Sequence, residues 1–302
     1  DRLRSHIETH YPKTIDDEIL ILLQEIDMLL RKNTFLPLFI LKTVVKIFQS
    51  LRNNPEINNE RGVSVRSTIH SLEIIIGEVE VMRSVLNDVP TVPRFSDIYC
   101  MFQSSKFELD EIEDTTENKI KFLNNTISEI IKEISKEYFA EFVDSEELSN
   151  IKKEFKDKVF TVLQNQYQNQ QQQPQQKLNN YYPHSTSSSS EANAHGFTTG
   201  KSSSDGSLLY SEQLRQFPFT KKIVNRVVEK IKGEQAEYIR KAQNTNISTN
   251  LEYLDYNNEA IGDFDKQEET LATITELFLE YLRFSTPPIL DRKENRFECM
   301  EI

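Results

Sequence analysis

The chain contains 302 residues with a formal net charge of −12, and its composition includes 7 glycines, 2 cysteines and no tryptophan. So few glycines argue against sandwiches, barrels and nucleotide-binding α/β sheets, because those folds use glycine at tight turns and close backbone approaches. The negative charge argues against nucleic-acid binding through the global field, so we expect no nucleic-acid partner. Two cysteines without a disulfide framework, and a start without a secretory signal pattern, favour a cytoplasmic protein.

The first predicted helix follows Thr14, which forms a capping-box pattern with Asp17. Apolar residues then recur at steps of four and three, as one stripe on an α-helix requires: Ile15, Ile19, Leu22, Ile26 and Leu29. The next helix is predicted over about 35–52 and is apolar nearly all round, so we expect it at the centre of the fold. It carries Lys42 and Lys46 and is too short to span a membrane.

Further helices are predicted up to the middle of the chain. Apolar spacing places helices over about 65–86 and about 120–138, with a short helix at about 95–102 between them. A second capping pattern, Asp144–Glu147, predicts another helix whose apolar stripe continues to Val162.

Residues 164–210 differ in composition from the rest of the chain, because runs of Gln, Asn and Ser replace the apolar stripes. Such a segment buries too little apolar area to offset its ordering entropy, so we expect it to be disordered. A flexible chain of about 45 residues spans roughly 35–40 Å, which is enough to bridge a helical bundle. We therefore divide the chain into a helical part at 1–163, the insert at 164–210 and a second helical part at 211–302 that can share its core with the first.

Helical periodicity returns after the insert. Apolar residues between Phe219 and Ile231 predict a long amphipathic helix, and a last helix is predicted from Thr270 to Leu282. The predicted fold is therefore all-α, an elongated antiparallel helical bundle with one long disordered insert.

Two motifs that suggest a metal or a nucleotide do not meet the requirements of those sites. His6 and His10 lie one helical turn apart, but their order differs from the zinc-binding H-E-x-x-H pattern and Pro12 cuts the segment short. The segment Gly196–Ser202 resembles a phosphate-binding loop but has one residue too few between its glycines. Neither motif therefore leads us to predict a metal ion or a cofactor.

Two other motifs also depart from the consensus patterns of the sites that they resemble. The acids of Asp255–Glu259 have the spacing of a calcium loop, but Ala260 stands at the required glycine and Lys266 at the closing glutamate. The chain ends in Cys299–Ile302, which follows the outline of a prenylation box with an acidic residue where an aliphatic one is usual. The sequence therefore predicts no catalytic residue and no metal site.

A basic face is the strongest candidate binding site. Between Phe219 and Ala242 basic residues outnumber acidic ones, and the predicted helix carries Lys221, Lys222, Arg226 and Lys230. A basic amphipathic helix in an acidic protein fits a contact with anionic lipid or with an acidic partner. The other interpretation is an ordinary solvated face of the bundle, and both interpretations stay open at this stage.

Several segments, taken in order, resemble the stalk of dynamin-like large GTPases. The opening His6-Ile7, Pro12 and Leu22-Leu23 are similar to the start of that stalk, and Arg94–Tyr99 with Phe102 resembles the short segment that re-enters its bundle. The late segments that carry the resemblance are Phe217-Pro218, Tyr253–Glu259 and the helix from Thr270, which would begin the effector segment that completes the bundle. Val92-Pro93 stands where the family has a glycine pair.

The resemblance implies a stalk-like module of a membrane-remodelling GTPase, which self-associates as a homo-oligomer and transmits force. In that case the nucleotide chemistry would belong to a GTPase domain upstream of Asp1, and the chain would contact membranes peripherally. The alternative is a non-enzymatic helical adaptor or scaffold subunit of an intracellular multiprotein complex. Because the sequence begins at Asp1 rather than Met, it is compatible with a piece of a longer protein.

Overall fold

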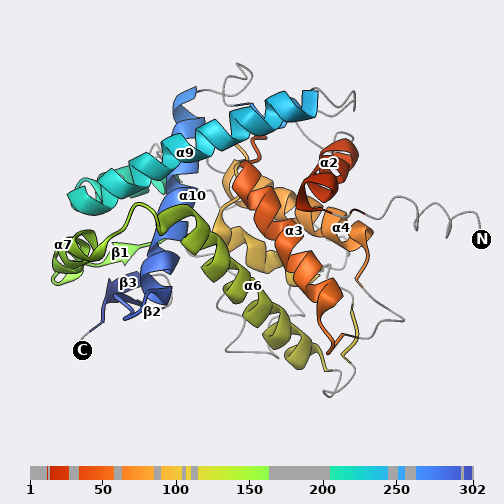
Figure 1. Cartoon of the computed structure of the whole chain (residues 1–302), viewed down its shortest axis with the longest axis horizontal. Coiled ribbons are helices and arrows are strands. Elements are labelled where there is room, and N and C mark those ends of the chain that lie inside the picture. The colour runs from red at the N-terminus through yellow and green to blue at the C-terminus, as the bar shows by residue number, and fades with distance from the viewer. Residues whose placement is uncertain are drawn as a thin grey trace, which may run out of the picture.

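The computed structural model describes residues 12, 14–26, 34–57, 63–84, 90–103, 107–109, 115–162, 205–243, 251–255, 263–293 and 296–300. The fold is mostly helical, as predicted (Figure 1). The elements of the first part are α2 (Ile15–Ile26), α3 (Leu38–Asn53), α4 (Val65–Val79), the π-helix η2 (Glu80–Ser84), the 3-10 helix η3 (Phe95–Gln103), α6 (Thr116–Phe139), α7 (Ser145–Phe155) and β1 (Phe160–Thr161). Those of the second part are α8 (Asp205–Leu214), α9 (Pro218–Gln243), η6 (Leu251–Leu254), α10 (Asp263–Phe284), β2 (Leu290–Lys293) and β3 (Arg296–Cys299).

Both predicted capping boxes are present. The Thr14 N–H donates to Asp17 and the Asp17 N–H donates to the Thr14 hydroxyl at 3.1 Å, so the two residues close the start of α2 reciprocally. Asp144 and Glu147 form the same arrangement at the start of α7. These local signals therefore fixed where two helices begin.

The end of α7 differs from the prediction. The helix stops at Phe155 instead of continuing to Val162, and the chain turns into β1, where Phe160 pairs with Phe297 of β3. Together with β2 these strands form a small antiparallel sheet in the order β1-β3-β2, which the sequence did not predict. The reason is that the pairing partner of β1 lies more than a hundred residues away, so no local periodicity reports it.

The predicted insert overlaps the described structure at one end. Residues 163–204 lie outside the described residues, whereas α8 begins at Asp205, inside the segment 164–210 that was expected to be disordered. Tyr210 and Leu214 of this helix are fully buried, and that burial supplies the stabilisation that the Ser-rich composition concealed.

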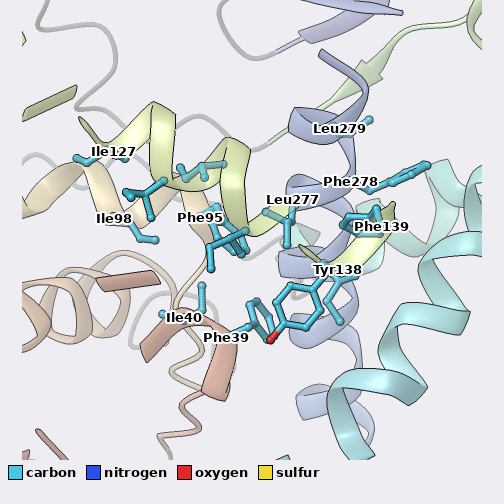
Figure 2. Close-up of a cluster of buried hydrophobic side chains, with 14 of the residues drawn as sticks. Phe39, Ile40, Phe95, Ile98, Ile127, Tyr138, Phe139, Leu277, Phe278 and Leu279 are labelled. Carbon is cyan, nitrogen blue, oxygen red and sulfur yellow. The ribbon is translucent and has the colours of Figure 1, made fainter. Parts of the chain in front are cut away.

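One large hydrophobic cluster contains residues from both sides of the insert. Figure 2 shows its centre, where Phe39 of α3, Phe95 of η3, Tyr138 of α6 and Leu277 of α10 converge. The ring of Phe39 stacks on that of Phe95 with 5.7 Å between centroids and meets Tyr138 edge-on at 6.1 Å. The two helical parts of the chain are therefore packed around one core.

Helix α10 packs against α6, α8, α9 and η3. Figure 1 shows α3 and α6 side by side and running in opposite directions, with α9 crossing over α10. A second, smaller cluster joins α2, α3 and α4 through residues such as Leu22, Leu41 and Leu72. Helix α3 is buried nearly all round, as its apolar sequence predicted, and α10 is buried from Glu269 to Glu280 except at Leu271, which is partly buried.

Candidate functional site

A row of buried carboxylates on α10 is the most unusual chemical feature of the core. With about 3.6 residues per turn, Glu269, Thr273, Glu276 and Glu280 fall in one narrow stripe along the helix. All four side chains are buried, with exposed fractions between 0% and 5%. Burial of a carboxylate is costly unless it is paired and hydrogen-bonded, so the partners of this row decide its role.

Arg94 holds the first carboxylate of the row. Its Nη2 lies 2.8 and 3.0 Å from the two carboxylate oxygens of Glu269, and its Nε lies 3.2 Å from one of them. The guanidinium also sits 5.1 Å from the centroid of the Tyr210 ring. Burial by itself would lower the pKa of Arg94, but Glu269, Tyr210 and Glu276 outweigh it and raise this pKa, so the guanidinium stays charged.

The other two carboxylates are held by different elements. Glu276 accepts a hydrogen bond of 2.7 Å from the Tyr210 hydroxyl and one of 3.1 Å from the backbone N–H of Ser96. Glu280 accepts from Arg292 of β2 at 2.5 Å and from Arg283 at 3.0 Å. Helix α10 is thus tied by its acidic stripe to η3, α8 and β2.

A small cavity lies beside this row, lined by Ser96, Tyr99, Glu276, Glu280 and Arg292 among others. Its volume of about 10 Å³ matches the space of one water molecule. Burial, followed by the charge of Glu280, raises the pKa of the Tyr99 phenol, so Tyr99 stays protonated at neutral pH. The cavity can hold a bridging water between polar groups but leaves no room for an organic substrate.

Two buried polar atoms near the row lack a hydrogen-bond partner among the described residues, namely Arg94 Nη1 and Thr270 Oγ1. A buried guanidinium nitrogen without a partner is costly, so the Arg94 site is not fully satisfied by the described protein atoms. Its bidentate contact with Glu269 nevertheless satisfies the charge itself.

A second buried ion pair joins the first three long helices. Glu18 of α2 is fully buried and accepts hydrogen bonds from Arg52 of α3 and, at 2.8 Å, from the Thr68 hydroxyl of α4. Arg52 in turn donates to Thr68 at 3.3 Å. Each charged group of this cluster therefore contacts the group of opposite charge and the Thr68 hydroxyl, which accepts from Arg52 and donates to Glu18.

Most of the basic residues predicted as a binding face are engaged within the protein. Arg226 lies 3.4 Å and Lys222 3.8 Å from the same carboxylate oxygen of Glu147 on α7. Lys230 pairs with Glu141 at 2.6 Å and lies over the rings of Tyr138 and Phe142. Lys221 is exposed and forms no ion pair with any described residue.

The remaining sequence motifs contribute little to a site. His6, His10 and the segment Gly196–Ser202 lie outside the described residues, as does most of the acidic segment after Asp255. Cys299 lies half-buried in β3, where its thiol faces the Met300 carbonyl. In the described ranges no three His, Cys, Asp or Glu side chains gather in a way that could hold a metal ion.

The sequence predicted neither the buried acidic row of α10 nor its ion pair with Arg94. The signal was present, because the acids at 269, 276 and 280 share one helical face, but such a stripe normally marks the side of a helix that faces solvent.

No family model, no curated protein and no solved structure matches this chain. Among the helices that the structure describes, none combines the length and hydrophobicity that crossing a bilayer requires.

Proposed function

We propose that this chain is a non-catalytic helical assembly module, a rigid unit that self-associates and positions other components of a larger complex. The observation that carries this proposal is the use of the buried charged groups. Glu269, Glu276 and Glu280 are the most enzyme-like residues of the core, yet each is bound by arginines, a tyrosine or a backbone N–H of the same chain. Groups committed in this way fix the relative positions of helices.

The rigidity has a structural basis. Helix α10 comes from the second part of the chain but lies among α6 and η3 of the first part, and its acidic stripe binds Arg94 and Ser96 there. A load applied to one part is therefore passed to the other through a packed core and buried ion pairs. This property suits a scaffold or an arm that transmits motion.

Sedimentation velocity over a range of protein concentrations tests the assembly proposal. We expect oligomers whose population grows with concentration, and a chain that stays monomeric at every concentration would contradict the proposal. The non-catalytic part is tested with Glu276→Gln. We expect no hydrolytic turnover of nucleotides, phosphoesters or glycosides by either form, and a turnover that the substitution abolishes would overturn this part.

A more specific candidate is the stalk of a dynamin-like GTPase, and two placements favour it. Arg94 and the start of η3, which follows it, are buried in the core, and the resemblance assigns the segment that re-enters the bundle to this part of the chain. The helix that contains Thr270 completes the core as α10. The discriminating observation is the coding sequence upstream of Asp1. This candidate requires a GTPase domain with a G-x-x-x-x-G-K-[ST] loop there, and an upstream region without one rejects it while leaving the assembly proposal intact.

A further inference from the structure

One end of the molecule combines exposed lysines with exposed apolar side chains. Figure 1 shows α7, β1 and the first turns of α9 together at this end, on the left of the view. Among the described residues the large exposed hydrophobics are Val81, Val159 and Phe219, with 60%, 45% and 40% of their surfaces exposed, and the last two belong to this end. We name the surface formed by Lys152, Lys153, Lys156, Val159, Phe219 and Lys221 the α7–α9 tip.

Direct contacts hold the two segments of the tip together. The carboxylate of Glu154 accepts hydrogen bonds from the backbone N–H groups of Phe219 at 2.6 Å and Thr220 at 3.1 Å. Lys158 Nζ donates to the Gln216 carbonyl at 2.7 Å, and the rings of Phe155 and Phe217 lie 4.5 Å apart. Val159 and Phe219, each next to one of these contacts, are therefore displayed on the same end of the protein.

The lysines of the tip are exposed to solvent and form no ion pairs with the described acidic side chains. Lys152, Lys153, Lys156 and Lys221 are exposed, and none of them pairs with an acidic side chain in the part of the chain that the structure describes. The nearby acid Glu154 is occupied by the start of α9, and Glu147 is occupied by Lys222 and Arg226. Glu146 and Asp157 are further exposed acids of this segment, but the four lysines outnumber them, so the tip is locally basic on a protein whose net charge is −12.

We infer that the α7–α9 tip binds the surface of an anionic phospholipid membrane. Lysine ammonium groups attract lipid phosphates without demanding a fixed geometry, and single apolar side chains between them can enter the headgroup region. Protein–protein interfaces are depleted in lysine and enriched in arginine, so an acidic protein partner fits this lysine-dominated surface less well. The acidic remainder of the molecule is repelled by the same membrane, which orients the tip toward it.

This inference revises the basic face predicted from the sequence. Of the residues predicted there, Lys221 belongs to the tip, whereas Lys222, Arg226 and Lys230 are used in ion pairs with α7 and with the end of α6. The charges that replace them come from α7, a helix that no sequence pattern had connected with the start of α9. The inference does not depend on self-association, because vesicle binding by a monomer would satisfy it.

Vesicle co-sedimentation of the whole chain tests the inference. We expect binding to phosphatidylcholine vesicles that contain phosphatidylserine, weak or no binding to phosphatidylcholine alone, and loss of binding as salt rises. A lysine near an anionic surface accounts for about a fivefold change in affinity. K152Q/K153Q/K156Q/K221Q should therefore lower the affinity by roughly several hundredfold if all four lysines reach the surface, and by at least about tenfold if only two of them do. V159S/F219S should lower it a few-fold at every salt concentration.

A matched control separates the tip from general charge. K121Q/K132Q/K136Q/K241Q removes the same charge from exposed positions on α6 and on the far end of α9, and it should leave vesicle affinity within about twofold of the wild type. Absence of binding by the wild type, or equal losses in both quadruple variants, would overturn the inference. Binding of a polyglutamate peptide without any binding of vesicles would overturn it in favour of an acidic protein partner.

Discussion

Helices α3 and α10 are the two central helices of this fold, and each carries one narrow polar stripe. In α3 the stripe contains Lys42 and Lys46, and in α10 it contains Glu269, Glu276 and Glu280. The side chain of Lys46 keeps 17% of its surface exposed and binds Glu133 and Glu137 at the surface, whereas the side chain of Glu269 is 2% exposed. Two similar sequence patterns therefore lie in opposite environments.

Side-chain length and the available partners determine which charged residues a buried helix tolerates. A lysine on a central helix can extend its stem along apolar surface and keep its ammonium near water. A glutamate is shorter, so on a fully enclosed helix it must meet its partners inside the core. Arg94 and Tyr210 are such partners for Glu269 and Glu276, and they come from segments that are more than a hundred residues apart in the chain.

The largest effect is expected at Arg94. Arg94→Met removes the charge that compensates Glu269 and should lower the free energy of unfolding by about 3–5 kcal/mol. Urea denaturation followed by circular dichroism measures this loss.

The double variant Arg94→Met/Glu269→Met provides the control, because it removes both charges and should recover most of the lost stability. On the same helix, Arg283→Met should cost less than about 1 kcal/mol, since Arg283 is partly exposed and Glu280 keeps Arg292. An equal loss of stability in Arg283→Met and Arg94→Met would show that a half-exposed arginine contributes as much as a buried one and would contradict this prediction.

A truncation in α3 tests its apolar side in the same way. Leu41 is fully buried in the cluster that joins α2, α3 and α4, so Leu41→Ala should cost about 3 kcal/mol through lost burial and the cavity left behind. Thermal and urea denaturation should agree on this value. Because no charge is involved, the loss should not change between low and high salt, and a salt-dependent loss would argue that the α2–α3–α4 cluster depends on the Glu18–Arg52 pair instead.

Stability should fall in alkaline solution. Burial and the neighbouring Glu234 raise the pKa of Tyr138 above its ordinary value of 10.0, and burial raises that of Tyr99. A folded-state pKa above the unfolded one means that the stabilisation is fully present below about pH 10 and is lost as the pH rises through the folded-state value. The midpoint of urea denaturation should therefore be steady up to about pH 10 and then decrease.

Tyr138→Phe tests this prediction more directly, because it removes one of the two buried tyrosine hydroxyls whose ionisation should destabilise the fold. Its denaturation midpoint should decrease less steeply above about pH 10 than that of the wild type, whatever its stability at neutral pH. An unchanged slope would place the alkaline sensitivity elsewhere.

The smallest effect is expected at the polar stripe of α3. Burial alone would lower the pKa of Lys46, but its hydrogen bonds with Glu133 and Glu137 outweigh burial and raise it. Both glutamates are more than 40% exposed, so their attraction is screened by solvent and Lys46→Met should change stability by less than about 1 kcal/mol. A loss comparable to that of Arg94→Met would show that the charged stripes of α3 and α10 contribute equally to stability and would contradict this prediction.

Much of the helical framework could be predicted from sequence because its signals are local. The caps at Thr14 and Asp144 and the apolar periods of α3, α4 and α6 each depend on residues within a few turns. Prediction failed where a segment depends on distant partners, as at Phe160, which leaves the helical period to pair with Phe297. The sequence predicted only part of the α7–α9 tip, because it indicated Lys221 as a binding residue but not the lysines in and next to α7.

Local sequence signals were sufficient to predict that this chain is helical, where most of its helices begin and that α3 is central, because periodicity and capping act over a few residues. The ends of α4, α7 and α9 and the start of α10 differ from the prediction. The inward orientation of the acidic stripe of α10, the binding of Glu269 by Arg94 and of Glu276 by Tyr210, and the pairing of the basic face of α9 with Glu147 and Glu141 depend on the tertiary structure. The physical reason is that the free energy of a charge depends on which groups surround it, and those groups are brought together by folding from positions far apart in the chain.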